Sequence, residues 1–174
     1  MMKKSFVLSL LVLLAVSPAA YAESHGHRLS IGAGAAYGDW LGSSLSYEFE
    51  SRHHNAVEVA ATGFLHYEDC PTCGHVCPES FWHNYNLFSA GVAWKPCVLT
   101  RKNSWGNLRL GAGIGTAGED VVPSILLGYE RNYALRSGCS FFWQLRTDVL
   151  FNSTELFRPG AFIGFKFPIY KNAL

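Results

Sequence analysis

Residues 141–151 read FFWQLRTDVLF, and residues 160–169 read GAFIGFKFPI. In both stretches the odd positions are apolar or aromatic apart from one threonine, and every glycine and charged residue stands at an even position. A period of two predicts β-strands, because successive side chains leave opposite faces of a pleated sheet. One aromatic-rich apolar face and one face of glycine and charge are typical of a strand that crosses a membrane within a barrel.

Residues 1–22 predict a cleaved signal peptide. Two lysines precede an apolar stretch, residues 6–16, that is too short to cross a bilayer as a helix, and residues 20–22 form a small-x-small cleavage signal. We expect cleavage before Glu23, which leaves residues 23–174 as one mature domain. No second apolar run of membrane-helix length follows in the sequence.

The composition favours an outer-membrane protein and argues against binding to nucleic acid. Charged residues make up 16% of the chain, below the roughly 25% of a soluble domain. Aromatic residues make up 14%, and there are 17 glycines. The formal net charge is +1, so the basic excess of a nucleic-acid-binding protein is missing. We therefore expect the bacterial outer membrane as the location, its lipid as a partner, and no direct nucleic-acid contact.

Eight stretches have the alternation of membrane-spanning strands and at least the length that such a strand needs, about nine to eleven residues. They run over residues 28–37, 41–50, 55–67, 82–95, 107–117, 122–131, 139–151 and 158–169. The fourth is the least regular, because Phe88 and Trp94 compete with Leu87 and Ala93 for the apolar face. The polar run 100–104 is expected to separate the fourth strand from the fifth. The sequence thus predicts an all-β fold, an eight-stranded antiparallel up-and-down transmembrane β-barrel.

The face of these strands opposite the apolar one distinguishes a membrane barrel from a soluble, lipocalin-like barrel. It carries eight glycines, which a solvated surface does not need but the interior of a narrow barrel does. It also carries seven charged residues: Glu48, Glu58, Arg109, Glu130, Arg146, Asp148 and Lys166. We predict that these point inward and pair within an interior filled by side chains, with no cofactor. A proton relay or catalytic site is the alternative interpretation of the same charges.

Three cysteines, Cys70, Cys73 and Cys77, lie in the longest predicted connection, which strand parity places outside the cell. Exported cysteines usually form disulfides, and Cys70 could pair with either of the others. Together with the histidine between them they could instead bind zinc, or they could stay free thiols. We favour a disulfide and assign no metal site. Cys97 and Cys139 are expected near the periplasmic end.

An enzymatic role finds little support in the sequence. Small outer-membrane barrels include lipid A acyltransferases and deacylases, which need a nucleophile and a base near the membrane rim. His66, Ser80, His83 and Ser89 are available there, but their spacing gives no compact Ser/His/acid arrangement. We therefore predict no catalytic residues, and a lipid A-modifying enzyme remains the less favoured alternative.

The end of the chain resembles a known family. Residues 145–150, LRTDVL, and residues 157–167, FRPGAFIGFKF, are similar to the ending of the TraO family, the conjugal transfer proteins encoded on Bacteroidetes conjugative transposons. A weaker similarity reaches back to about residue 85, and the cysteine-rich loop departs from the family. The resemblance implies a non-catalytic outer-membrane part of a mating apparatus that works with other transfer proteins. A general OmpA- or OmpX-like barrel, serving surface interaction or envelope integrity, is the alternative.

Overall fold

The computed structural model describes residues 24–38, 40–66, 86–117, 120–135, 138–151 and 156–171. The predicted signal peptide and the loop with Cys70, Cys73 and Cys77 lie outside these ranges, as do Ser80 and His83. No helix in the described part of the chain is long and apolar enough to cross a membrane.

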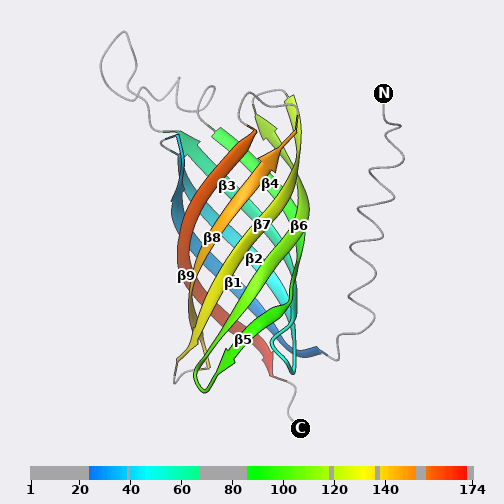
Figure 1. Cartoon of the computed structure of the whole chain (residues 1–174), viewed down its shortest axis with the longest axis vertical. Helices are drawn as coiled ribbons and strands as arrows, with labels where there is room; N and C mark the ends of the chain where they lie inside the picture. Colours follow the sequence, from blue (N-terminus) through cyan, green and yellow to red (C-terminus); the bar gives the residue numbers. More distant parts are fainter. Residues whose placement is uncertain are drawn as a thin grey trace.

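The described residues form a closed antiparallel β-barrel (Figure 1). Its strands are β1 Ser24–Ala36, β2 Trp40–Ser51, β3 Ala56–His66, β4 Asn86–Lys95, β5 Cys97–Arg101, β6 Ser104–Ala117, β7 Asp120–Ala134, β8 Ser140–Leu150 and β9 Phe157–Lys171. Each strand pairs with its neighbour in the chain except that β4 and β5 both pair with β6, and β1 pairs with β9 to close the ring. Since β4 and β5 form one interrupted strand, the barrel has the predicted eight strands.

The junction of β4 and β5 differs from the prediction. Pro96, which has no N–H to donate, interrupts the strand, but its carbonyl oxygen still accepts a hydrogen bond of 3.0 Å from the Leu108 N–H. The polar run 100–104 is not a loop, because Thr100 ends up paired with Trp105 and the turn shrinks to residues 102–103. The prediction was wrong because it relied on the polarity of the side chains. The strand is formed by backbone pairing with β6, which does not depend on side-chain polarity.

The barrel has an apolar outside and a polar inside. On β8, Leu145 faces outward and is 54% exposed, whereas Arg146 faces inward and is 6% exposed. On β4, Phe88 and Trp94 face outward and Ala93 is buried, which settles the strand that the sequence left ambiguous. This arrangement is the reverse of a soluble barrel. The closed ring pairs the backbone groups of β1–β4 and β6–β9 with neighbouring strands, as hydrocarbon surroundings require.

Glycines make room inside the narrow barrel. A Cβ atom on Gly164 would lie 2.1 Å from the Ile31 carbonyl oxygen and 2.7 Å from the Phe142 ring. A Cβ atom on Gly42 would lie 2.6 Å from the Phe162 ring. The large rings of Phe142 and Phe162 therefore fit inside the barrel because the residues that face them are glycines, which have no side chain.

The strand ends define two different ends of the barrel. Strand β1 begins and β9 finishes at the same end (Figure 1), which we call the terminal end. Its connections, residues 52–55, 102–103 and 135–139, are short, whereas the connection over residues 67–85 leaves the opposite end.

Aromatic side chains gather on the outer wall towards the terminal end. The rings of Tyr47 and Phe49 lie 5.0 Å apart, and the Phe141 ring lies 5.7 Å from Phe165 and 6.3 Å from Tyr133. A band of outward aromatic rings is typical of the level where a transmembrane barrel meets the polar interface of the bilayer.

Candidate functional site

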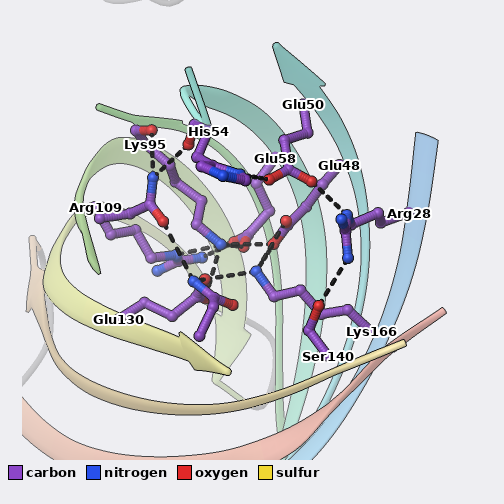
Figure 2. A network of polar contacts seen from close by, with 12 residues as sticks. Arg28, Glu48, Glu50, His54, Glu58, Lys95, Arg109, Glu130, Ser140 and Lys166 are labelled. Atoms are coloured by element: carbon purple, nitrogen blue, oxygen red, sulfur yellow. Dashed lines mark hydrogen bonds and ion pairs between the residues drawn. The ribbon is translucent and has the colours of Figure 1, made fainter. Parts of the chain in front are cut away.

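Six buried charged side chains from six strands meet inside the barrel (Figure 2). They are Glu48, Glu58, Lys95, Arg109, Glu130 and Lys166. None is more than 4% exposed. We call this cluster the polar core, and its three carboxylates balance its three cations.

Lys95 lies at the centre of the polar core. Its ammonium nitrogen is 2.5 Å from Glu48 Oε1, 2.7 Å from Glu130 Oε2 and 3.0 Å from Glu58 Oε2. An ammonium group has three N–H donors, so the three carboxylates use all of them. One side chain on β4 thereby ties together β2, β3 and β7 across the lumen.

The other two cations complete the pairing. Lys166 Nζ donates to both oxygens of Glu48, at 2.8 and 2.9 Å, and to Glu130 Oε1 at 2.5 Å. Arg109 donates through Nε and Nη2 to Glu58 Oε1, at 2.8 and 2.6 Å. Each carboxylate therefore contacts two cations, which is the arrangement that a buried charge needs to offset its desolvation.

The three carboxylates raise the question of a metal ion, because each offers an oxygen within 4.8 Å of the others. Hard divalent cations prefer such oxygen ligands. In this structure, however, the Lys95 ammonium group stands between the three carboxylates and hydrogen-bonds to each of them. The geometry is that of an ion-pair network whose central cation is a lysine.

A second polar group lies on the terminal side of the core. Glu50 pairs with Arg28, and its Oε1 lies 2.7 Å from His54 Nδ1. Arg28 also donates to Ser140 Oγ at 2.7 Å. The His54 ring stacks on Trp105 at 4.3 Å. These contacts extend the polar filling of the lumen towards the terminal end.

Arginines and aromatic rings fill another part of the interior. The Arg146 guanidinium lies 3.9 Å from the centre of the Phe162 ring and 5.2 Å from that of Phe64. The Arg158 guanidinium lies 4.7 Å from the Trp40 ring. Cation–π contacts of this kind are strongest where water is excluded, and Phe64 and Phe162 are each 1% exposed. We call these residues the arginine–aromatic layer.

The structure separates the seven predicted interior charges into two groups. Five of them belong to the polar core: Glu48, Glu58, Arg109, Glu130 and Lys166. Arg146 and Asp148 are also buried, but they contact each other, with Nη2 and Oδ2 3.8 Å apart. Arg146 packs mainly on aromatic rings.

Sequence reasoning missed several interior residues, most importantly Lys95. It shares the odd parity of the buried Ala93, so a settled register for that strand would have found it. Glu50 follows Glu48 by two residues and is buried like it, and Arg158 is buried on the same face as Phe162. In each case the odd or even position of the residue along its strand could have identified it as an interior residue.

Little space is left inside. Two cavities beside the polar core each have a volume of about 10 Å³, which is close to the least that one water molecule needs. An eight-stranded barrel is narrow enough for its side chains to fill it. A larger hollow of about 710 Å³ lies on the outer wall between Leu45, Phe88 and Ile114, where it faces the surrounding lipid.

The remaining candidates give no compact site among the described residues. Cys97 and Cys139 are free thiols, and Cys97 Sγ lies 3.4 Å from Thr100 Oγ1. Ser89, considered above for lipid chemistry, is half-buried on β4. The side chain of His66, which was considered with it, lies outside the described residues.

The fold resembles those of solved bacterial outer-membrane barrels. The outer membrane protein Ail of Yersinia pestis matches with a TM-score of 0.51 and 15% identity, over 82% of this chain and 99% of that one. A major outer membrane protein of Thermus thermophilus matches with a TM-score of 0.56 and 12% identity, over 83% and 98%. No protein-family model matches the chain, and no curated protein matches its sequence. At these identities the likeness concerns the fold alone.

The chain is a transmembrane β-barrel of the bacterial outer membrane. The closed ring, the apolar outer wall with its aromatic band, and the buried ion pairs define this class. Barrels of this class have short periplasmic turns and longer external loops, and the long connection over residues 67–85 leaves the opposite end, so we infer that the terminal end faces the periplasm.

Proposed function

We propose that this protein is a non-catalytic, non-conducting anchor in the outer membrane, which holds other proteins at its periplasmic end. The observation that carries the proposal is the polar core, whose hydrogen bonds cross the lumen from β4 to β2, β3 and β7. A lumen filled in this way leaves no path for a solute. Its charged groups are paired with one another, so none is free to act as a nucleophile or base.

Conductance measurements test the anchor against a pore. The purified barrel, inserted into a planar lipid bilayer, should give no stepwise current at voltages where a general porin, run as the positive control, conducts. Regular conductance steps from the wild-type barrel would contradict the proposal, because they require a continuous water-filled path past Lys95.

We place this anchor in a conjugative transfer apparatus. The support is the resemblance of residues 145–150 and 157–167 to the ending of the TraO family. An eight-stranded barrel is too narrow to pass a DNA–protein complex, so its part in transfer is to hold other transfer proteins. The segments that suit such contacts lie at the periplasmic end, near residues 96–103 and 131–137.

A clean deletion in a donor strain tests the setting. Transfer frequency should fall sharply and recover when the gene is supplied in trans, while growth and resistance to detergent stay unchanged. The same deletion in the recipient serves as the control and should leave transfer unaffected.

The second candidate is a general barrel for surface interaction or envelope integrity, and the specific observation in its favour is the fold that the chain shares with the Yersinia and Thermus outer-membrane proteins. Normal transfer from the deleted donor, together with a weakened envelope, would make this the better assignment.

A further inference from the structure

Strand β5 has one paired edge and one unpaired edge. It pairs with β6 from Cys97 to Arg101. On its other side the barrel ladder stops, because β3 pairs with β4 only as far as Ala56 opposite Lys95. The last contact there is the hydrogen bond of 2.8 Å from the Cys97 N–H to Asn55 Oδ1. Among the described residues no strand pairs with the rest of that edge.

The free edge lies at the terminal end of the barrel (Figure 1), and because unpaired backbone groups are not tolerated in hydrocarbon, we infer that it lies outside the hydrocarbon layer, on the periplasmic side. Trp94 is the last outward residue of β4 and is 46% exposed, as expected for an aromatic side chain at the bilayer interface. After Pro96, β5 continues away from that level and joins β6 through the turn at residues 102–103. Its backbone groups can therefore be reached by a soluble protein.

Basic side chains surround this edge. Arg101 and Lys102 are exposed at the tip of the β5–β6 hairpin, and Arg52 and His53 are exposed in the neighbouring β2–β3 turn. In contrast, every acidic residue whose side chain the structure describes is buried. We call Arg52, His53, Arg101 and Lys102 the basic rim.

We propose that the free edge of β5 binds an extended, acidic segment of a periplasmic partner, which adds a strand to the sheet beside the basic rim. Main-chain hydrogen bonds to the edge supply the binding mode. Charge complementarity with the basic rim selects the partner. The proposal rests on the proposed anchor function and names the chemistry of the protein that the anchor holds.

The basic rim also disfavours pairing of this edge with a second copy of itself. Natural edge strands avoid self-association through shortness, bulges and positive charge. Strand β5 has five residues, a register irregularity between Cys97 and Leu99, and Arg101 at its end. Two such edges repel each other, whereas an acidic strand neutralises the same charges.

One backbone group on the edge can be removed selectively. In a two-residue hairpin the residues next to the turn form the hydrogen-bonded pair, here Arg101 and Ser104. The pairs alternate, so the Thr100 N–H is directed away from β6 and towards the free edge. Thr100→Pro deletes this donor and spares the β5–β6 ladder, while Thr100→Ala keeps it and serves as the matched control.

The test measures binding of a fluorescent synthetic peptide, which alternates glutamate and valine, to the full barrel in lipid nanodiscs. Wild type and Thr100→Ala should bind equally, and binding should weaken as salt is added. Thr100→Pro should weaken binding by at least about tenfold, and so should the double variant Arg101→Glu/Lys102→Glu. A peptide with lysine in place of glutamate should not bind. Amide exchange at Thr100 should slow in the complex.

Several results overturn the proposal. These are no binding by the wild type, equal binding by Thr100→Pro, or equal binding by the charge-reversed variant. Binding that depends on the basic rim but not on the Thr100 N–H would point to an anionic lipid headgroup surface. The outcome is separate from the anchor proposal, which stands or falls with conductance and donor transfer.

Discussion

Replacing Lys95 with methionine tests the role of the polar core most directly. Lys95 is 0% exposed, and the substitution keeps an unbranched side chain of nearly the same length but removes the ammonium group that donates to three carboxylates. Three buried carboxylates would then face two cations. We expect a large loss of stability, because the charge left behind is unpaired and cannot reach water.

The magnitude follows from two estimates. Removing one partner of a buried ion pair typically costs about 3–5 kcal/mol. The variant can limit this cost by taking up one proton, and protonating an ordinary glutamate at pH 7 costs about 3.7 kcal/mol. The free energy of unfolding should therefore fall by about 3–4 kcal/mol at pH 7. Proton uptake becomes easier in acid by about 1.4 kcal/mol per pH unit, so the loss should shrink to about 1 kcal/mol at pH 5.

Urea unfolding of the barrel in lipid vesicles, followed by tryptophan fluorescence at pH 7 and pH 5, measures both values. Adding Glu130→Gln to Lys95→Met leaves two carboxylates and two cations, so the double variant should recover most of the loss at pH 7. Arg101→Met removes an exposed cation and should change stability by no more than about 0.5 kcal/mol.

Two results would contradict this expectation: a Lys95→Met variant that is as stable as the wild type at pH 7, or a loss of stability that is the same at both pH values. The first result would mean that the polar core contributes nothing net to stability. The second would mean that the loss comes from packing and not from charge.

Four other predictions can be tested. Unboiled protein should migrate differently from boiled protein on a gel and show β-type circular dichroism; a helical spectrum would contradict the fold. Gly164→Ala should impair folding, since its Cβ would lie 2.1 Å from a backbone oxygen, whereas Gly63→Ala meets only ordinary contacts and should fold normally. Lipid-facing probes should label a cysteine placed at Leu145 and not one placed at Arg146. Finally, an impermeant thiol reagent on intact cells should label the cysteines in residues 70–77 mainly after reduction, and full labelling without reductant would exclude the disulfide.

The amino-acid sequence alone predicts the class of fold and, for most strands, which side chains face inward. Alternation with a period of two fixes which side chains share a face, and the glycines and charges on one face require that face to be the inner one. The positions of Leu145 and Arg146 followed from parity alone. These features are local, because they depend on neighbouring residues in one strand.

Which interior charges contact one another depends on the tertiary structure. Contacts across the lumen depend on the stagger between strands and on the reach of each side chain, and neither is visible in a single strand. Lys95 is the clearest example. It is the one charged residue of β4, a strand with irregular alternation, yet it contacts carboxylates from β2, β3 and β7. The same stagger sets Arg146 against the Phe162 ring and leaves the edge of β5 open at the periplasmic end.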